Sequence, residues 1–486
     1  MKLHLILYNQ INLKYFDTNI SKYFLYIHNN WKIIFNNEEL KLNEKSYILD
    51  FAQWYNFIQE INDKWYHWDF LVWKNYYTTI LDYCIKNNFK QIELIQPVED
   101  YVHKNFLKIK DKLWNKWINL HIKQDNISFF MNHNEFLAQY EKPPVMENFY
   151  RFMRKKHVIL MENEKPLGWK WNYDEQNRKF DKGHKKTWDF KLEKENIWIQ
   201  EAKKYYCYED SINYPTTRIE AINLLNYFVK NHLDNFGRLE DAMYLDDTFV
   251  HHSNISTAIN FWLLQAKEVV EVIHKQNTAI NNKEGFIRQI LWWREYMYHF
   301  FHFYKDDIYR NNFFWFDKKL PDYFWNSKVK SDLNCVNTVV KRVLEKNYSH
   351  HIERLMIIGN FTLLNGIDPH DVNKWFFEKY TDAFEWVVSP NVLTMSQYSD
   401  WWKLATKPYI SSGNYINKMS NYCKSCKYDI KTKYEKDSCP FNYLYWNFVE
   451  ENKEVFQKTR QPFVVKNLEK VDIEKIKEIK KYYEKK

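Results

Sequence analysis

Gln91-Ile92-Glu93-Leu94-Ile95-Gln96 is an apolar run of strand length, and it decides the fold of the N-terminal part of the chain. A helix-like stretch follows at 104–116, and Ile118-Asn119-Leu120-His121-Ile122 then alternates apolar and polar residues as a strand does. Strand patterns at 2–7 and 23–27 and a helical pattern at 74–87 precede this unit. Strands that alternate with helices predict βαβ units and a parallel sheet.

Three regions follow from the pattern along the chain. Residues 1–130 are predicted to form an α/β domain, and 131–205 are polar and irregular, with Pro143-Pro144, which indicates an interdomain linker. Helical periodicity dominates from about 216 onward, so 206–486 is predicted to be an all-α domain. Near its end, an apolar stripe predicts a docked amphipathic helix, made of Leu468, Val471, Ile473, Ile476, Ile479 and Tyr483.

Composition excludes several classes of protein. Hydrophobic residues are 45% and charged residues 27% of 486, which is not typical of a disordered chain. No stretch reaches the ~20 apolar residues of a membrane helix, and the first apolar run is too short for a secretory signal. We therefore expect a cytoplasmic, monomeric protein without a membrane partner. The net charge of +9 is modest, so contact with a polyanion requires a local basic patch.

Six cysteines carry the first chemical signal. Cys423, Cys426 and Cys439 are separated by two and twelve residues, and Pro440 follows. A C-x-x-C pair in an intracellular chain is more often a metal or redox site than a structural disulfide. Thiolates select zinc or an iron–sulphur cluster, and spacing alone does not decide between them. A fourth ligand from a remote Cys or His is required.

Basic and aromatic residues are mixed at 148–157 and 170–179. Arg and Lys neutralise phosphates while aromatic rings stack on unpaired bases, but a chain with 19% aromatics produces such runs by chance. His350 and His351 are adjacent, so on a helix they point in different directions. Histidine is a natural proton donor near neutral pH, although two structural histidines are the simpler interpretation.

Several longer stretches carry a resemblance to a known family. They are 146–156, 171–178, 284–290 with 293–296, His350-His351, 359–361 with 366–369, 395–397 and, longest of all, 406–423. Together they resemble the iron–sulphur bacterial cryptochromes and photolyases, the prokaryotic (6-4) photolyase branch. The resemblance is strong over 146–465. It implies a Rossmann-like α/β domain, a linker and a helical FAD-binding domain.

The resemblance implies cofactor sites. It implies a [4Fe–4S] cluster held by Cys335, Cys423, Cys426 and Cys439, since thiolates ligate such clusters. It implies FAD, with the diphosphate on the segment 252–256. The flavin-binding residues that it implies are Ser253, Ser256, Asn260, Arg288, Arg294 and Asp382. Two segments depart from the family pattern. Tyr8-Asn9-Gln10-Ile11 leaves the binding of a lumazine antenna open, and Val387-Val388-Ser389-Pro390 leaves the flavin's proton partner open.

The resemblance also implies light-driven repair of UV-damaged DNA. A flipped-out pyrimidine photoproduct would receive an electron from reduced FAD and a proton from the histidine pair. The residues implied to face the lesion or DNA are His350, His351, Leu355, Tyr409, Tyr415, Asp174, Arg178, Arg151 and Lys155. Trp325 and Trp375 match an electron-transfer chain, and Phe376 stands where a redox-active Tyr is frequent.

Tryptophan replaces the family's glycine at five positions: Trp169, Trp262, Trp292, Trp401 and Trp402. Only 7 of 486 residues are glycine, whereas about 7% is usual. Either the protein repacked these sites, or a UGA codon that the source organism reads as glycine was translated as tryptophan.

Three functions remain as hypotheses. The first is a (6-4) photolyase, which the histidines with Tyr409 and Tyr415 favour. The second is a cryptochrome-type flavin photoreceptor. The third is a non-photochemical nucleic-acid-binding protein with a structural cluster, which the five tryptophans would favour if they are real.

Overall fold

A five-stranded parallel sheet forms the N-terminal part of the computed structural model, with strand order β5-β2-β1-β6-β7. The structure describes residues 2–16, 23–28, 32–35, 38–72, 76–125, 127–192, 196–459 and 462–484. The strands of the sheet are β1 (Lys2–Leu7), β2 (Tyr23–His28), β5 (His67–Val72), β6 (Gln91–Ile95) and β7 (Asn119–Lys123). The predicted parallel sheet is therefore confirmed. A small antiparallel pair, β3 (Lys32–Phe35) and β4 (Glu38–Lys41), lies apart from it.

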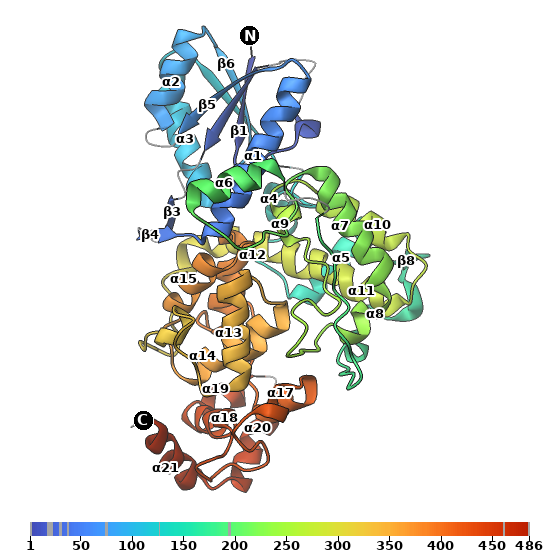
Figure 1. Ribbon diagram of the computed structural model, residues 1–486, viewed down its shortest axis with the longest axis vertical. Helices are drawn as coiled ribbons and strands as arrows, with labels where there is room; N and C mark the ends of the chain where they lie inside the picture. The colour runs from blue at the N-terminus through green and yellow to red at the C-terminus, as the bar shows by residue number, and fades with distance from the viewer. Residues whose placement is uncertain are drawn as a thin grey trace.

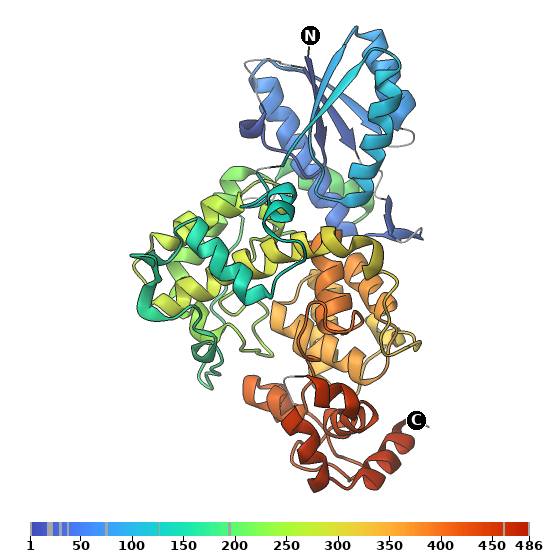
Figure 2. The ribbon, with the colours of Figure 1, turned by 180° about the vertical axis from the view of Figure 1, so that it is seen from behind.

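Helices cover both faces of this sheet (Figures 1 and 2). Leu3, Leu5 and Leu7 point to the face covered by α2 (Tyr76–Lys86) and α3 (Asp100–Trp114), because alternate side chains of a strand share a face. Ile6 points to the other face, which α1 (Glu44–Asp63) covers. Prediction missed α1 and β5, and Lys74 of the predicted 74–87 helix lies outside the described residues. Asn43 begins α1 by accepting the Ser46 N–H at 3.0 Å.

Residues 131–205 are more ordered than predicted. They contain α4 (His133–Gln139), α5 (Met146–Lys156), the short pair β8 (Met161–Glu162) and β9 (Lys165–Pro166), and α6 (Ile197–Tyr206). Phe136 and Phe149 are buried in the largest core, so α4 and α5 belong to the helical body. The prediction of an irregular segment is wrong here because the aromatic residues of both helices are core residues among charged neighbours.

The helical body confirms the periodicity that begins near 216. Its helices are α7 (Arg218–Asn231), α8 (Leu233–Leu239), α9 (Ser256–Asn260), α10 (Ala266–His274), α11 (Ile280–Arg288), α12 (Glu295–Ile308), α13 (Asn334–Lys346), α14 (Asn360–Leu364), α15 (Pro369–Lys379) and α16 (Glu385–Ser389). Thr217 begins α7 with a reciprocal cap, because its hydroxyl accepts the Glu220 N–H while the Glu220 carboxylate accepts the Thr217 N–H.

The C-terminal region lies at the end of the molecule opposite the sheet (Figure 1). It contains α17 (Gly413–Met419), α18 (Pro440–Glu451), α19 (Lys453–Lys458), α20 (Pro462–Lys466) and α21 (Ile473–Glu484). Ile476 and Ile479 of α21 are buried, and Tyr483 stacks on Tyr443 of α18 at 5.4 Å. The predicted docked helix is confirmed. Among the helices of the described residues, none is long and apolar enough to span a membrane.

Candidate active site and metal centre

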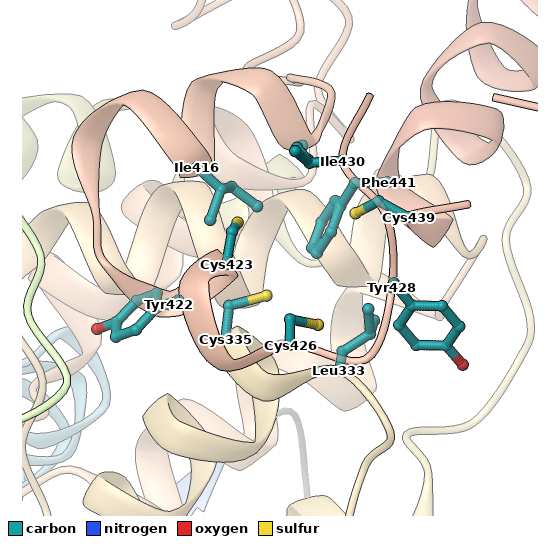
Figure 3. Close-up of a pocket in the computed structure, with 11 residues that line it drawn as sticks. Leu333, Cys335, Ile416, Tyr422, Cys423, Cys426, Tyr428, Ile430, Cys439 and Phe441 are labelled. Atoms are coloured by element: carbon teal, nitrogen blue, oxygen red, sulfur yellow. The ribbon is translucent and has the colours of Figure 1, made fainter. Parts of the chain in front are cut away.

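Four cysteines surround one cavity in the C-terminal region (Figure 3). Cys335 lies in the first turn of α13, Cys423 lies in a 3-10 turn at Tyr422–Ser425 with Cys426 directly after it, and Cys439 caps α18. The remaining lining is mostly apolar and includes Leu333, Ile416, Ile430 and Phe441. The structure thus brings together the four cysteines that the sequence resemblance selected. Cys84 and Cys207 are not among the residues that line this cavity.

Backbone contacts shape this cavity. The Cys426 N–H donates to the Cys423 carbonyl at 3.3 Å, and the Cys439 N–H donates to the Asp429 carbonyl at 2.8 Å. A Cβ on Gly413 would lie 2.9 Å from Sγ of Cys439 and would meet Ile430. Glycine at 413 therefore leaves room on the sulfur side of the cavity.

Burial controls the protonation of these thiols. It raises the pKa of Cys439 to about 12 and that of Cys423 to about 11, and the neighbouring cysteines add to the rise. Burial also raises the pKa of Cys335 well above its ordinary value. Thiolates at this place therefore need a positively charged group, so binding of a metal or cluster has to release protons. Four thiols in a mostly apolar cavity therefore suit a metal ion or a metal cluster.

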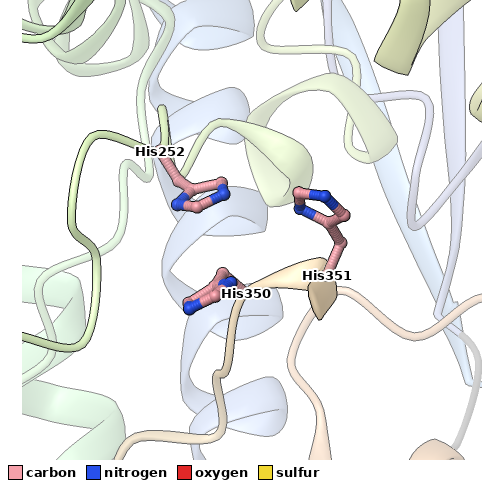
Figure 4. Close-up of side chains that lie close together, drawn as sticks. All are labelled: His252, His350 and His351. Carbon is pink, nitrogen blue, oxygen red and sulfur yellow. The ribbon is translucent and has the colours of Figure 1, made fainter. Parts of the chain in front are cut away.

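Three histidines form a second cluster (Figure 4). His252 lies in the segment between α8 and α9, and His350 and His351 follow α13. The ring of His252 stacks on that of His350 with centroids 4.5 Å apart, and it meets the ring of His351 edge-on at 5.3 Å. His252 and His350 are buried, whereas the side chain of His351 is 36% exposed. The two adjacent side chains therefore lie in different environments, His350 buried and His351 partly exposed.

Charge around the cluster is uneven. Burial lowers the pKa of His252 to about 3 and that of His350 well below its usual value, and the other histidines add to both shifts. A carboxylate oxygen lies 3.8 Å from Nε2 of His350, on Glu353, and 3.8 Å from Nε2 of His351, on Asp241. Only the side chain of His351 is also partly exposed, so of these two rings it is the one that a ligand can reach.

The predicted DNA-side residues gather beside His351. Arg178 pairs with Asp174, and its Nε lies 3.5 Å from the Asp241 carboxylate. Burial raises the pKa of Tyr409 and Tyr415, and carboxylates of this group contribute to both shifts. Asp241, which prediction did not select, thus lies near His351, Arg178 and Tyr415, while Asp174 pairs with Arg178 and lies near Tyr409.

Two of the predicted flavin residues, Ser256 and Asn260, contact a third, Asp382. Its carboxylate accepts the Ser256 hydroxyl at 2.8 Å, and its backbone carbonyl accepts the Asn260 side-chain amide at 3.2 Å. Arg354 completes the group with two bonds of 3.1 Å to the same carboxylate. Ser253 is half-buried, three residues before the start of α9 at Ser256. Prediction missed Arg354, although an arginine within the apolar stretch 352–358 is itself a signal of a buried ion pair.

Unpartnered polar atoms support a cofactor at this place. Oδ1 of Asn254 and Oγ1 of Thr257 are buried and have no hydrogen-bond partner within the described part of the chain. Buried polar groups are normally paired, so this segment is suited to a polar ligand. The residues present therefore fit the phosphate-bearing part of a flavin nucleotide.

Arg288 and Arg294 have different partners. Arg288 is buried between carboxylates, 3.3 Å from Asp174 and 3.5 Å from Glu240. Arg294 donates to the Ser128 carbonyl at 2.6 Å and lies over the Trp386 ring at 4.9 Å. The partners recorded for each arginine therefore do not include Asp382.

The other predicted residues have separate positions. Trp375 is fully buried and donates to the Phe324 carbonyl at 2.7 Å, while Trp325 is half-buried beneath Lys379. Leu355 is half-buried on the helical turn after His351. Arg151 and Lys155 lie on the exposed side of α5, over the ring of Trp171 at 5.4 and 5.6 Å.

Comparison with known proteins agrees with this geometry. A protein called (6-4) photolyase from Agrobacterium fabrum is 41% identical over an alignment of 351 residues. The alignment covers 69% of this chain and 69% of that protein. The chain belongs to the (6-4) photolyase family. The model of the deoxyribodipyrimidine photo-lyase-related protein family also matches, over residues 41–206.

Two further similarities extend this result. The structure of a bacterial class III photolyase from Agrobacterium tumefaciens shares the photolyase fold, with a TM-score of 0.61 and 12% identity over 99% of this chain and 98% of that one. An uncharacterized mimivirus protein, R855, is 41% identical over 93 residues, 19% of this chain and 72% of its own length. The photolyase fold predicted for this chain is thereby confirmed.

Proposed function

We propose that this chain is a light-driven photolyase that repairs (6-4) photoproducts in DNA. The observation that carries the proposal is the grouping of His351 with Asp241, Arg178, Tyr409 and Tyr415 beside a flavin-binding segment. Light-driven DNA repair is the activity of the family to which the chain belongs. The grouping adds a proton donor, cations for phosphates and aromatic side chains for an extruded base.

His351 is proposed as the general acid. The lesion needs a proton on the oxygen that leaves, and a donor has to carry that proton near neutral pH. Burial keeps His252 and His350 neutral, so they offer apolar ring faces rather than a proton. His351 alone of the three combines exposure with a nearby carboxylate, Asp241. Asp241 then holds the charged ring in place until the proton moves to the lesion oxygen.

FAD is the proposed flavin, held by Ser253, Ser256, Asn260 and Asp382 with Arg354. When bound, the flavin supplies the light-excited electron for the lesion. Trp375 and Trp325 are proposed to carry electrons between the surface and this site, since their rings are oxidisable and one is fully buried. Near the end of β1, where the sequence departs from the family pattern, the Gln10 amide donates to the Ile95 carbonyl at 2.9 Å; no antenna is included in the proposal.

A [4Fe–4S] cluster is the proposed occupant of the cysteine cavity. A tetrahedral zinc ion with bonds of about 2.3 Å would bring four sulfurs within about 3.8 Å of one another. Among the described residues, the group whose ligand atoms all lie within 4.8 Å consists of the three histidines and includes no cysteine. Sulfurs spread around a cavity suit a multi-atom cluster better than one ion (Figure 3).

Contact with DNA is proposed along the face that carries Arg178, Arg151 and Lys155. All three cations are at least partly exposed, and the latter two flank the ring of Trp171. Each phosphate contact that they make should weaken with salt. Arg151 and Arg178 are paired with Glu147 and Asp174 in this structure, so DNA phosphates would have to compete with these carboxylates.

A defined oligonucleotide with a single (6-4) photoproduct tests the proposal. Under blue light, the purified protein should restore two intact pyrimidines, detected by chromatography, and should do nothing in the dark. A cyclobutane dimer in the same sequence is the matched control and should stay unrepaired. A photoreceptor would change its flavin absorption under light and leave both lesions intact. A simple nucleic-acid-binding protein would bind the DNA equally in light and dark and repair neither lesion. Either outcome would overturn the proposal.

A further inference from the structure

Seven tryptophans adopt a backbone conformation that favours glycine. Among the described residues, seventeen that are not glycine have positive φ, and seven of these are tryptophan, with φ from 47° to 74°. Tryptophan is only 21 of 486 residues, so the excess is large. Four others are asparagine, which tolerates this region, whereas for a bulky side chain it is an outlier. The seven are Trp65, Trp117, Trp169, Trp262, Trp315, Trp401 and Trp402.

Two of them stand where helices require a left-handed residue. After α1, the Tyr66 N–H donates to the Ile61 carbonyl at 3.2 Å and the Trp65 N–H donates to Asn62 at 2.9 Å. The same pair of bonds closes α3, from Ile118 to Leu113 and from Trp117 to Trp114. This is the Schellman motif, whose left-handed position is usually glycine.

Side-chain contacts do not explain the choice of tryptophan at most of these positions. Trp65, Trp117, Trp169 and Trp315 are 88%, 84%, 78% and 87% exposed, so their rings bury little apolar area. A large exposed indole adds no packing that offsets an unfavourable φ. Trp262 differs, because it is buried and donates to the Ser128 hydroxyl at 2.7 Å.

We propose that the natural protein carries glycine at these seven positions, encoded by UGA codons that its own cells read as glycine. The chain's shortage of glycine and its many tryptophans then have one cause. Four of the positions, Trp169, Trp262, Trp401 and Trp402, coincide with departures from the family pattern. Trp65, Trp117 and Trp315 come from backbone geometry alone.

The proposal also separates these positions from other tryptophans. Trp292 lies in the π-helical turn Gln289–Arg294 and stacks on Tyr150 at 5.4 Å, so backbone geometry gives no reason for glycine there. Trp114 is 63% exposed but lies inside α3 with helical geometry. Trp375 is fully buried. Backbone conformation, rather than exposure, is therefore the criterion.

The codons and the natural polypeptide provide the decisive test. Sequencing the gene should show UGA at the seven positions and UGG at Trp114 and Trp375. Mass spectrometry of peptides from the protein made in the source organism should then give the mass of glycine at each of the seven. UGG at Trp65, Trp117 and Trp315, or tryptophan in those peptides, would overturn the proposal.

Three variants of one helix end test the physical argument separately. Trp117→Gly should raise the melting temperature by roughly 2 °C or more, because it relieves an unfavourable φ. Trp117→Ala removes the same ring but keeps a Cβ, so it should give less than half of that rise. Trp114→Gly is the matched control inside the helix and should lower the melting temperature. Equal shifts for Trp117→Gly and Trp117→Ala, or a fall in both, would contradict the proposed demand for glycine.

Discussion

The cysteine cavity and the histidine cluster place similar metal-binding side chains in opposite environments. The cysteine cavity is lined mostly by apolar side chains, and burial raises the pKa of Cys335, Cys423 and Cys439 above the ordinary value of a thiol. The histidine cluster is partly exposed at His351, which lies 3.8 Å from Asp241, and Asp241 also lies 3.5 Å from Nε of the exposed Arg178. The first environment suits a permanent structural group. The second suits a group that gains and loses a proton in each reaction.

A buried ion pair lies between the two regions. Arg342 of α13 contacts Glu353, and its guanidinium also donates to the Tyr422 hydroxyl at 3.0 Å. Tyr422 precedes Cys423 in the chain, and Glu353 lies 3.8 Å from Nε2 of His350. Buried polar contacts therefore join the segment that carries Cys423 to the histidine cluster, so a change at one site can disturb the other.

Loss of one cysteine ligand should have the largest effect. Cys426→Ser should give insoluble protein, because the bound group supplies folding energy to the segment 423–439 and to Cys335. Soluble yield and visible absorption measure this. Cys207→Ser, at an exposed cysteine outside the cavity, should match the wild type. A soluble, coloured Cys426→Ser protein would remove the basis for the cysteine centre.

Removal of the proposed acid should leave the fold intact and stop repair. His351→Ala should keep FAD and damaged-DNA binding, yet lose at least about 100-fold in repaired product per photon. His350→Ala should lose less, because its buried ring only packs beside the acid. If both variants melt earlier but repair normally per folded molecule, the histidines are structural only.

Breaking the ion pair between the regions should disturb both. Arg342→Met leaves the Glu353 carboxylate buried without its cation, which should cost roughly 3–5 kcal/mol in the free energy of unfolding. Denaturant titration measures this cost. The double variant Arg342→Met with Glu353→Leu removes both charges and should recover most of it. Equal stability of Arg342→Met and wild type would show that the pair does not connect the two regions.

A smaller effect is expected in the pH dependence of stability. Burial, followed by the charge of Glu99, raises the pKa of Glu385 to about 8. A carboxyl whose pKa is raised on folding stabilises the protein below its unfolded pKa, near 4.3, and that contribution is lost as pH rises through 8. Glu385→Gln should therefore flatten the decline in melting temperature between pH 5 and 9. An unchanged decline would exclude Glu385 as its source.

Sequence reasoning reached the parts of this molecule that local patterns encode. Alternation in 118–122 predicted a parallel strand, and the apolar stripe near the C-terminus predicted α21. The helices α4 and α5 were missed because their buried aromatics are mixed with charged residues. Their burial depends on contacts with α12, such as Tyr296 beside Phe149, which no local pattern reveals.

The candidate sites also contain residues that local sequence patterns could not identify. The four cysteines were found through a resemblance, since Cys335 is 88 residues from Cys423. Arg354 and Asp241 were missed because each acts through a partner distant in sequence, Asp382 and His351 respectively. Ion pairs across the fold depend on tertiary structure, so spacing in one sequence could not identify them.

One preparation of the wild-type protein should be analysed for flavin, iron and zinc and then irradiated with the (6-4) oligonucleotide, so that cofactors and repair are measured on the same molecules. We expect FAD and iron without zinc, and repair that requires light. Zinc in place of iron would contradict the assignment of the cysteine cavity. An FAD-loaded protein that binds the lesion under blue light and leaves it unrepaired would contradict the assigned chemistry of the histidine cluster.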